Sequence, residues 1–294
     1  MGLNDEEYNW QQDELEALIN RGIRLQGQMD PKNKVRVAYD TCQRECIVKV
    51  MSNDSDELDV LQRLLALPSP RNHVIPCELI RCKSSTLAFM PLLRVLSGHI
   101  IPYHGVQSIL DFMTQMVEAL DFMHEHYIAY SDVANLNIVA PSKNTPAEFP
   151  PFSITRGRYY IIDFGSSRVL PKGPGEGLLV GDFFQYPGHF MPPEGTDAVD
   201  PYAYDVYSLG ETIHDVCEAA RHRAQIQAPR SVLHLVNTLR SPDPSRRPTM
   251  RQLVGITRAI CFWVSNTTWL YKVFPAIIAD YLDYYGWRLI RVFV

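Results

Sequence analysis

The strongest clue to the architecture of this chain is YYIIDFG at residues 159–165, an apolar run that ends in Asp163, Phe164 and Gly165. Such a run is typical of a buried strand that gives way to a polar turn. An earlier stretch, DVANLN at residues 132–137, begins with an aspartate and ends with an asparagine. Aspartate and asparagine in turns are commonly local caps. The two stretches therefore indicate a particular fold only if further motifs of that fold follow in the same order along the chain.

The residues that precede these stretches have the order of a small, mostly antiparallel sheet. Period-two alternation and apolar runs predict strands, and leucines at helical spacing predict a helix. The predicted elements are an amphipathic helix in the acidic segment 5–20, strands at 35–39 and 46–50, a helix at 56–67, and strands at 73–81 and 86–93.

Helical patterns dominate the second half of the chain. The apolar positions that recur on one face and predict a long helix are Ile109, Phe112, Met113, Met116, Leu120 and Met123. Further helices are predicted at 205–222, 230–240 and 249–260. We expect the boundary between the two halves near residues 92–100.

Composition narrows the class of protein. The chain has 294 residues, of which 46% are hydrophobic, so it can bury a sizeable core. A net charge of -5 gives no reason to expect nucleic acid or an anionic membrane as partner. Six cysteines without a C-x-x-C pair are typical of free thiols in a reducing compartment, which predicts an intracellular protein, cytoplasmic or nuclear. The longest uncharged run of the tail, 259–271, is well short of the ~20 residues that span a membrane.

Five further landmarks stand in one order with the two stretches above. They are Lys49 at the end of an apolar strand, Glu57 in the helix that follows, MPPE at 191–194, DVYSLG at 205–210 and DPSRRPT at 243–249. Together these landmarks resemble the protein kinase superfamily, whose catalytic loop is D-x-x-x-x-N and whose metal loop is D-F-G. The resemblance extends from Lys49 to Arg247.

The resemblance implies ATP and Mg²⁺ as cofactors and a set of catalytic residues. Asp132 would accept the proton of the attacking hydroxyl, and Asn137 and Asp163 would bind magnesium. Lys49, paired with Glu57, would bind the phosphates. Phosphoryl transfer needs this positioning and charge neutralisation more than it needs covalent chemistry.

The resemblance also implies a nucleotide pocket. Met90 would stand at the back of the adenine site, Leu92 in the hinge and Val139 at the floor. Ile47 stands where the family has a small alanine, so we expect a narrower or displaced slot for the adenine ring.

The later landmarks favour a protein as the phosphate acceptor. In the family, Glu194 would pair with Arg247, and Asp205 would brace the backbone of the loop that holds Asp132. Small-molecule phosphotransferases of the aminoglycoside and choline type lack these landmarks.

Several positions depart from the family's pattern. The segment 28–35 contains no glycine, although glycines there let backbone N–H groups approach the phosphates, and Asp30 would repel a phosphate if it pointed inward. Ser131 replaces the arginine before the catalytic aspartate, which argues against control by phosphorylation of the activation segment. Ala134 and Leu136 replace the basic residues that Ser/Thr and Tyr kinases carry in this loop.

We therefore predict an α+β, bilobal protein kinase-like fold with a small antiparallel N-lobe and a larger, mostly helical C-lobe. The predicted divisions are an N-terminal extension at 1–33, the N-lobe at 34–92, the C-lobe at 93–258 and an aromatic-rich extension at 259–294. The favoured function is ATP- and Mg²⁺-dependent phosphorylation of a protein hydroxyl, serine or threonine before tyrosine. The alternatives are a pseudokinase that serves as a binding or scaffold module, and a small-molecule phosphotransferase.

Two regions have no counterpart in the resemblance. Residues 140–158 are rich in proline and predict a surface insertion. The tail at 259–294 holds three of the four tryptophans, and it predicts either an extra helix over the C-lobe or an apolar surface for a partner. A misassigned exon end would give the same composition. No feature of the sequence specifies the substrate or the oligomeric state.

Overall fold

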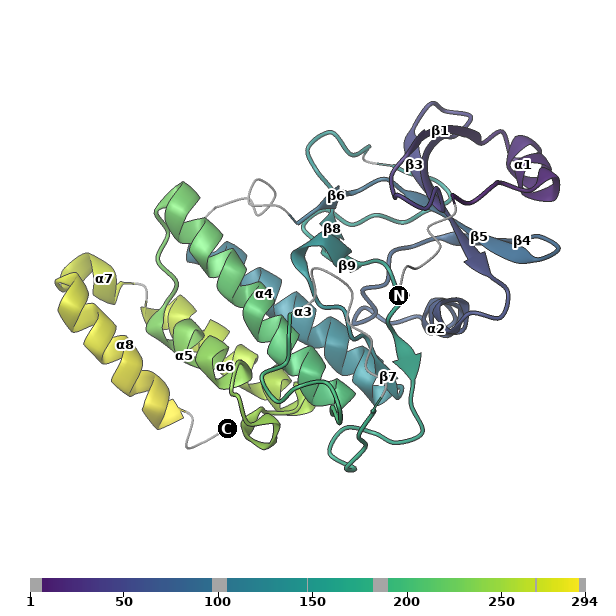
Figure 1. Cartoon of the computed structure of the whole chain (residues 1–294). Coiled ribbons are helices and arrows are strands. Elements are labelled where there is room, and N and C mark those ends of the chain that lie inside the picture. The colour runs from purple at the N-terminus through teal and green to yellow at the C-terminus, as the bar shows by residue number, and fades with distance from the viewer. Residues whose placement is uncertain (1–6, 97–104, 147, 182–189, 268, 291–294) are drawn as a thin grey trace.

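The computed structural model describes residues 7–96, 105–146, 148–181, 190–267 and 269–290. It is an α+β structure. A small antiparallel sheet from the first part of the chain lies at one end, and the long helices of the second part extend to the other (Figure 1). The predicted class and the predicted order of elements are therefore confirmed.

The larger sheet has five strands in the order β1-β2-β3-β5-β4, and every neighbouring pair is antiparallel. Its strands are β1 (Arg24–Gln28), β2 (Val35–Tyr39), β3 (Glu45–Ser52), β4 (Glu78–Arg81) and β5 (Ser85–Pro91). Strand β1 is not among the predicted elements, and it places part of the expected extension 1–33 in the sheet. Four of its five side chains are exposed, so backbone pairing with β2 rather than a buried face holds it.

The two faces of this sheet are buried by different helices, α1 (Gln12–Ile19) and α2 (Asp56–Leu65). On one face, α2 packs into the apolar cluster that contains Ala88. On the opposite face, Leu18 of α1 packs with Val48 and Phe89, which are cross-strand partners in β3 and β5. Because side chains alternate along a strand, Lys49 points away from Val48 and toward the α2 side.

Two small sheets follow. One has the strand order β6-β8-β9 and the other pairs β10 with β7. Their strands are β6 (Arg94–Val95), β7 (Ile128–Ala129), β8 (Ile138–Ala140), β9 (Tyr160–Ile161) and β10 (Arg168–Val169). Ile138 pairs with Ile161, so the stretches DVANLN and YYIIDFG lie side by side.

The predicted helices of the second half are present. They are α3 (Val106–Glu125), α4 (Pro201–Ala224), α5 (Arg230–Leu239) and α6 (Met250–Thr267). The apolar stripe of α3 is buried, and Asp200 caps the N-terminus of α4 through hydrogen bonds from Tyr202 N and Ala203 N. Helix α6 continues beyond the predicted end at residue 260 into the aromatic tail.

The tail forms two more helices, α7 (Leu270–Val273) and α8 (Ala276–Ile290). The carboxylate of Asp283, which is 1% exposed, attaches α8 to its neighbours. Its Oδ1 accepts a hydrogen bond from Trp263 Nε1 of α6 at 2.7 Å, and its Oδ2 accepts one from the backbone N of Arg230 at 2.9 Å. Asp283 therefore caps the first turn of α5 from a distant helix.

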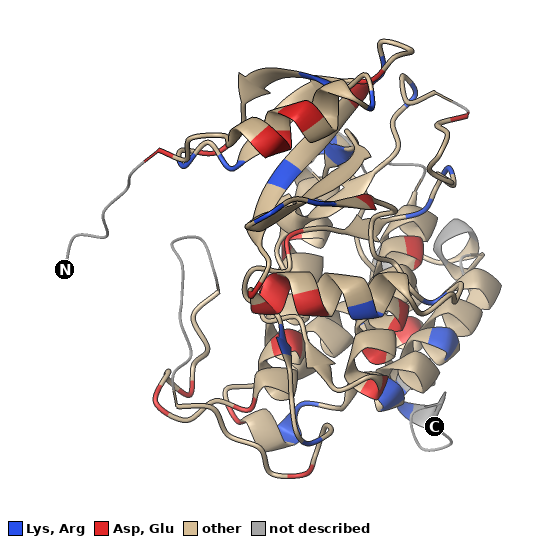
Figure 2. Ribbon diagram, turned by 90° about the vertical axis from the view of Figure 1, so that its right-hand side faces the viewer, with Lys and Arg blue, Asp and Glu red and all other residues tan. Residues whose placement is uncertain are grey.

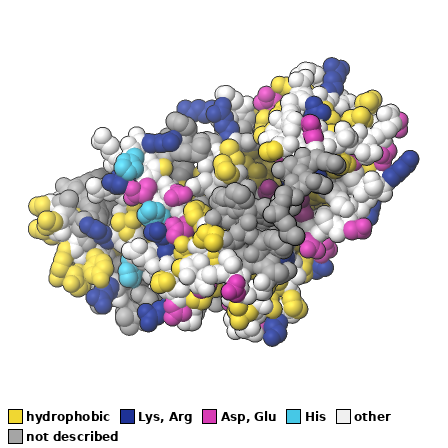
Figure 3. Space-filling model, viewed as in Figure 1, with side chains coloured by type: hydrophobic (Ala, Val, Ile, Leu, Met, Phe, Trp, Pro, Cys, Tyr) yellow, Lys and Arg dark blue, Asp and Glu magenta, His cyan; other side chains and the backbone are white. Residues whose placement is uncertain are grey.

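The outer side of the tail is apolar and exposed, as the hydrophobic side chains gathered at the α7–α8 end of Figure 3 show. The exposed residues are Trp269, Val273, Phe274, Ile277, Ile278, Tyr281, Leu282 and Tyr285. Both predicted properties of the tail are thus present, since it packs as helix on its inner side and exposes an apolar surface on its outer side.

We expect Asp283→Ala to lower the free energy of unfolding by about 2 kcal/mol, because it removes a helix cap and the acceptor of a partly buried indole N–H. Urea titration followed by circular dichroism measures the change. Tyr281→Ala on the same helix, at a side chain that is 60% exposed, is the matched control and should change stability little. Equal effects of the two substitutions would contradict the capping role.

The segment between β8 and β9 lies mostly at the surface, as predicted, but two of its side chains are buried. Phe149 and Phe152 are 4% and 8% exposed, and both belong to the cluster on the α1 side of the larger sheet. The ring centroids of Phe152 and Phe89 lie 5.4 Å apart. The proline-rich composition of residues 140–158 gives a loop, as predicted, but its two phenylalanines insert into the core of another part of the chain.

Among the described residues, no helix combines the length and the apolar character needed to cross a bilayer. Figure 2 shows lysine and arginine interspersed with aspartate and glutamate along the ribbon. This mixture accords with the small net charge of the sequence.

Candidate functional site

Three of the predicted site residues meet at one point. Lys49 on β3 is hydrogen-bonded through Nζ to Glu57 Oε1 in the first turn of α2. The same Nζ lies 2.8 Å from Oδ1 of Asp163, which follows β9. The side chains of Lys49 and Glu57 are largely buried, whereas that of Asp163 is 50% exposed. The ammonium group of Lys49 thus links the sheet to two acidic residues from separate elements. One of these, Asp163, faces solvent.

Burial alone would lower the pKa of Lys49, because desolvation penalises the ammonium ion. The charges of Asp163 and Glu57 and their hydrogen bonds outweigh burial, so the pKa of Lys49 lies above its ordinary value. Lys49 is therefore protonated throughout the neutral range and presents a fixed positive charge beside an exposed carboxylate.

The second group consists of Asp132 and Asn137, at the two ends of the predicted loop. Asn137 Nδ2 donates to Asp132 Oδ2 at 2.6 Å and to the Asp132 carbonyl at 3.1 Å. This leaves the amide oxygen Oδ1 of Asn137 as its remaining polar atom. The backbone of Asn137 accepts a hydrogen bond from Ile162 N at 3.0 Å, which ties the loop to the residue before Asp163.

The loop backbone is held by Asp205 of α4, as the resemblance implies. The carboxylate of Asp205 is fully buried and accepts hydrogen bonds from Tyr130 N at 2.8 Å and Ser131 N at 2.7 Å. It also lies 2.9 Å from Nε2 of His124. A buried carboxylate with several donors is a fixed support, since each donor would otherwise lack a partner.

Tyr130 supplies a connection that the sequence analysis does not predict. Its fully buried hydroxyl donates to the carbonyl of Ile162 at 2.5 Å, and its ring packs edge-on against Phe164. Tyr130, two residues before Asp132, is thus bonded to Ile162, the residue before Asp163. A tyrosine inside an otherwise apolar run at 128–130 is the signal in the sequence that a buried hydroxyl needs a partner there.

Two residues beside these loops have left-handed backbone conformations. Ser131 has φ 62° and Asp163 has φ 59°. Non-glycine residues rarely adopt this region, and they keep it where surrounding contacts over-determine the conformation, often at functional sites. Here the contacts are the Asp205 hydrogen bond to Ser131 N and the Lys49 hydrogen bond to Asp163.

The residues expected to line a nucleotide pocket are only partly assembled. Ile47 and Met90 are cross-strand partners, and both pack in the apolar cluster that also contains Val139 of β8. Leu92 lies next in the chain, where its N–H donates to the carbonyl of Glu45 at 3.1 Å, and its side chain is partly exposed. Ile47 and Met90 are thus neighbours on the sheet, Val139 is buried in the same apolar cluster, and Leu92 follows the last residue of β5.

The turn between β1 and β2 occupies the place where the family has its glycine-rich loop. Asp30 does not stand free, since its Oδ1 accepts a hydrogen bond from Val35 N at 2.7 Å within the hairpin. The N-terminal segment fixes the turn from outside, where Trp10 Nε1 donates to the Asn33 carbonyl and Asn33 Nδ2 donates to the Tyr8 carbonyl. The turn is therefore held by side-chain contacts in place of a flexible glycine backbone.

The expected pair of Glu194 and Arg247 is present and bidentate. Arg247 Nη1 and Nη2 lie 2.8 Å and 2.6 Å from the two carboxylate oxygens of Glu194. The guanidinium also stacks 5.0 Å from the ring of Tyr207 and donates to the Ser241 carbonyl. This pair joins the segment before α4 to the turn before α6.

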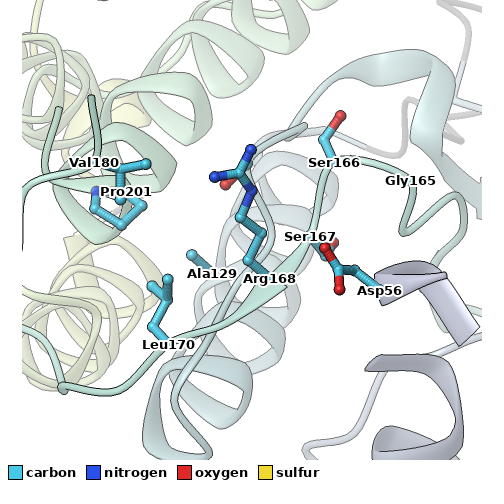
Figure 4. Close-up of a pocket in the computed structure, with 10 residues that line it drawn as sticks. Asp56, Ala129, Gly165, Ser166, Ser167, Arg168, Leu170, Val180 and Pro201 are labelled. Carbon is cyan, nitrogen blue, oxygen red and sulfur yellow. The ribbon is translucent and has the colours of Figure 1, made fainter. Parts of the chain in front are cut away.

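A cavity of about 110 Å³ lies beside Ser131 and Gly165, the neighbours of the candidate site residues (Figure 4). It is lined by Asp56 of α2, by Ser131 and Ala129, by residues 165–168 and Leu170, and by Val180 and Pro201. Figure 4 shows the guanidinium of Arg168 between Ser166 on one side and Val180 and Pro201 on the other. The sequence shows that no arginine stands at position 131, but it does not show that Arg168 of β10 pairs with Ala129, two residues before that position.

His73 is a buried titratable group behind the site. Its Nδ1 lies 2.7 Å from the carbonyl of Tyr159, and its Nε2 has no hydrogen-bond partner among the residues that the structure describes. Burial lowers the pKa of His73 to about 4; the hydrogen bond to Tyr159 opposes this, and the charge of Arg158 adds to it. His73 is therefore neutral in the folded protein near pH 7.

This pKa predicts an acid-sensitive stability. The unfolded chain binds a proton at His73 near pH 6.5, whereas the folded chain does so only near pH 4. The stabilisation is complete above pH 6.5, is lost as the pH falls toward 4, and amounts to about 3 kcal/mol. We expect His73→Asn, which keeps a donor but does not titrate, to flatten this part of the stability–pH curve. His222→Asn, at a side chain that is 66% exposed, should not.

Comparison with known proteins adds one relative. No family model matches the chain. An alignment over 164 residues, which covers 49% of this chain, is 24% identical to the Wee1-like protein kinase of Oryza sativa subsp. japonica. The match spans 27% of that protein, so this chain corresponds to about a quarter of its relative's length. The similarity indicates a protein kinase-like relationship for about half of the chain.

Proposed function

We propose that this chain is a bilobal, protein kinase-like domain that binds Mg²⁺-ATP and transfers its γ-phosphate to a protein hydroxyl, serine or threonine before tyrosine. One observation carries the proposal. Lys49, Glu57 and Asp163 come from three separate elements and converge on a single ammonium group. Chance would not bring together the positions that the resemblance assigns to phosphate and metal binding.

The donor set fits a magnesium ion. Magnesium prefers hard oxygen ligands and keeps several of its waters. The Asp163 carboxylate is half exposed, and the Asn137 amide turns its nitrogen to Asp132, which leaves Oδ1 as the available oxygen. The ion, when bound, would neutralise charge on the phosphates.

The chain's own residues would perform the remaining work. Lys49 would bind phosphate oxygens as a permanently charged donor, and Glu57 would hold its ammonium in position. Asp132 would accept the hydroxyl proton, with the Asn137 amide fixing the carboxylate. The adenine ring would pack against the apolar side chains of Ile47, Met90 and Val139.

A binding module without turnover is the second candidate, because one observation favours it. The turn that replaces the glycine-rich loop contains Asp30, which brings a negative charge to the hairpin, and it is fixed by Tyr8 and Trp10. Such a turn provides no nest of backbone N–H groups for the phosphates. The two candidates share nucleotide binding and differ in transfer.

Thermal unfolding with and without Mg²⁺-ATP tests the shared part. At a nucleotide concentration about 100 times Kd, the wild-type protein should gain about 2.7 kcal/mol of stability. Lys49→Met should lose this gain, because the charged donor at the convergence point is removed. Lys83→Met, at an exposed lysine in a turn, is the matched control and should keep it. Absence of stabilisation in the wild-type protein would refute nucleotide binding.

A further inference from the structure

The long loop that joins the antiparallel strands β8 and β9 links the two parts of the chain that carry the candidate site. It leaves β8, which follows Asn137, and returns as β9, which leads to Asp163. Between these strands the segment 149–158 reaches the opposite face of the larger sheet, where Phe152 packs on Phe89. The cross-strand partner of Phe89 is Val48, the neighbour of Lys49. One short segment therefore connects the strand of Asp163 to the back of the strand of Lys49.

The sheet end of this segment is held by a second contact. The guanidinium of Arg44, in the turn between β2 and β3, lies 4.6 Å over the ring of Phe149. Its Nη2 donates to the carbonyl of Pro150 at 2.6 Å. Asp40 orients the guanidinium through a hydrogen bond from Nε, also at 2.6 Å. The contact is thus a directed, charge-assisted one, and the side chain of Arg44 is only 18% exposed.

The other end is fixed to the helical part and to the loop after α2. Thr155 N donates to the hydroxyl of Tyr160 at 2.9 Å, and Gln115 of α3 donates to the Gly157 carbonyl at 2.9 Å. Arg158 Nη2 donates to the carbonyls of Pro70 and Asn72. Hydrogen bonds at both ends leave the segment little freedom to lengthen.

We propose that the segment 149–158 is a strap that fixes the larger sheet over the candidate site, with Phe152 and Arg44 as positioning residues for nucleotide binding. Only the effect of the strap on nucleotide binding rests on the proposed function. The strap fixes the distance between Lys49 and Asp163, because it links the sheet that carries Lys49 to the strand β9 that precedes Asp163. A fixed sheet also accords with the β1–β2 turn, which is held by side chains rather than left flexible.

Amide hydrogen exchange without nucleotide tests the strap independently of ATP. The reporters are Ile75 N, which donates to the Ile161 carbonyl, and Ile161 N, which donates to the His73 carbonyl. These bonds join the loop after α2 to β9. We expect Phe152→Ala to accelerate exchange at both amides at least tenfold, and Phe152→Leu to restore most of the protection.

The control is Leu235→Ala, at a leucine of α5 that is 3% exposed and lies among the helices away from the sheet and the strap (Figure 1). It should lower stability without selective exchange at Ile75 and Ile161. If Phe152→Ala does not fold, Arg44→Met removes the Pro150 hydrogen bond while it leaves the phenylalanine core intact, and it should give the same selective acceleration. Equal exchange profiles for the strap and control variants would overturn the proposal.

The nucleotide arm compares Mg²⁺-ATP affinities of the same variants. Phe152→Ala and Arg44→Met should raise Kd at least fivefold, and Leu235→Ala should leave it within twofold of the wild-type value. If exchange accelerates while the affinities stay equal, the strap does not position the nucleotide site and the proposal fails in that part. If the wild-type protein binds no Mg²⁺-ATP, the proposed function fails, and exchange alone decides whether the strap exists.

Discussion

Replacing Asp132 with asparagine is expected to reduce phosphate transfer about 10³-fold, since a positioned base typically contributes two to four orders of magnitude. The substitution keeps the size of the side chain and removes the charge that would accept the hydroxyl proton. Mg²⁺-ATP binding should persist, because Lys49, Glu57 and Asp163 hold their contacts without Asp132. Incorporation of labelled γ-phosphate into a generic protein acceptor measures transfer, and thermal stabilisation measures binding.

Asp215→Asn is the control for charge removal. Asp215 lies on α4, is 49% exposed and accepts a hydrogen bond from Asn135 in the same loop. Its substitution should leave transfer within a few-fold of the wild-type rate. Transfer that survives Asp132→Asn undiminished would show that another group accepts the proton. Binding without transfer in the wild-type protein would establish the binding module in place of the kinase.

Asp205→Ala is expected to cost more than about 3 kcal/mol of unfolding free energy, because it leaves buried backbone donors without an acceptor. Tyr130 N and Ser131 N would lose their acceptor, and both residues are largely buried. The loop should then lose its geometry, so that transfer falls further than stability alone explains. Urea titration measures the loss of stability. The transfer assay, at a temperature at which the variant is fully folded, measures the loss of activity separately.

Two variants of the same helix sharpen this result. Asp205→Asn keeps one acceptor oxygen and should cost less than the alanine variant. Asp215→Ala, at the exposed carboxylate, should change stability by less than about 0.5 kcal/mol. A small effect of Asp205→Ala would contradict the supporting role that its hydrogen bonds assign to it.

The sequence predicts the parts of this fold whose patterns are periodic. The helix that begins at residue 56 and the long helix each bury the expected apolar side. The strand at 35–39 is also present, although its buried residue is Ala38 rather than the alternating Val35 and Val37. The convergence of Lys49, Glu57 and Asp163 is different. Periodicity locates each residue on its own element, and only the resemblance predicts that the three elements meet.

The features that escape prediction lack a local signal. Strand β1, with the sequence RLQGQ, has no buried face to impose alternation, so only its backbone pairing defines it. Phe149 and Phe152 stand among prolines, and their partner Phe89 lies far away in the chain. Asp283 interrupts an apolar helix without showing, from its neighbours, that it caps another one. In each case the stabilising contact is a tertiary one.

The central claim is that Asp163 and Lys49 form a magnesium-nucleotide site. The dependence of ATP affinity on Mg²⁺ tests it most directly, by calorimetric titration of ATP with and without the ion, in the wild-type protein and in Asp163→Asn. The proposal predicts that Mg²⁺ strengthens ATP binding at least tenfold in the wild-type protein and has no effect in Asp163→Asn. The claim would be contradicted if the wild-type protein bound no ATP in the presence of Mg²⁺. It would also be contradicted if Mg²⁺ changed the ATP affinity equally in the wild-type protein and in Asp163→Asn.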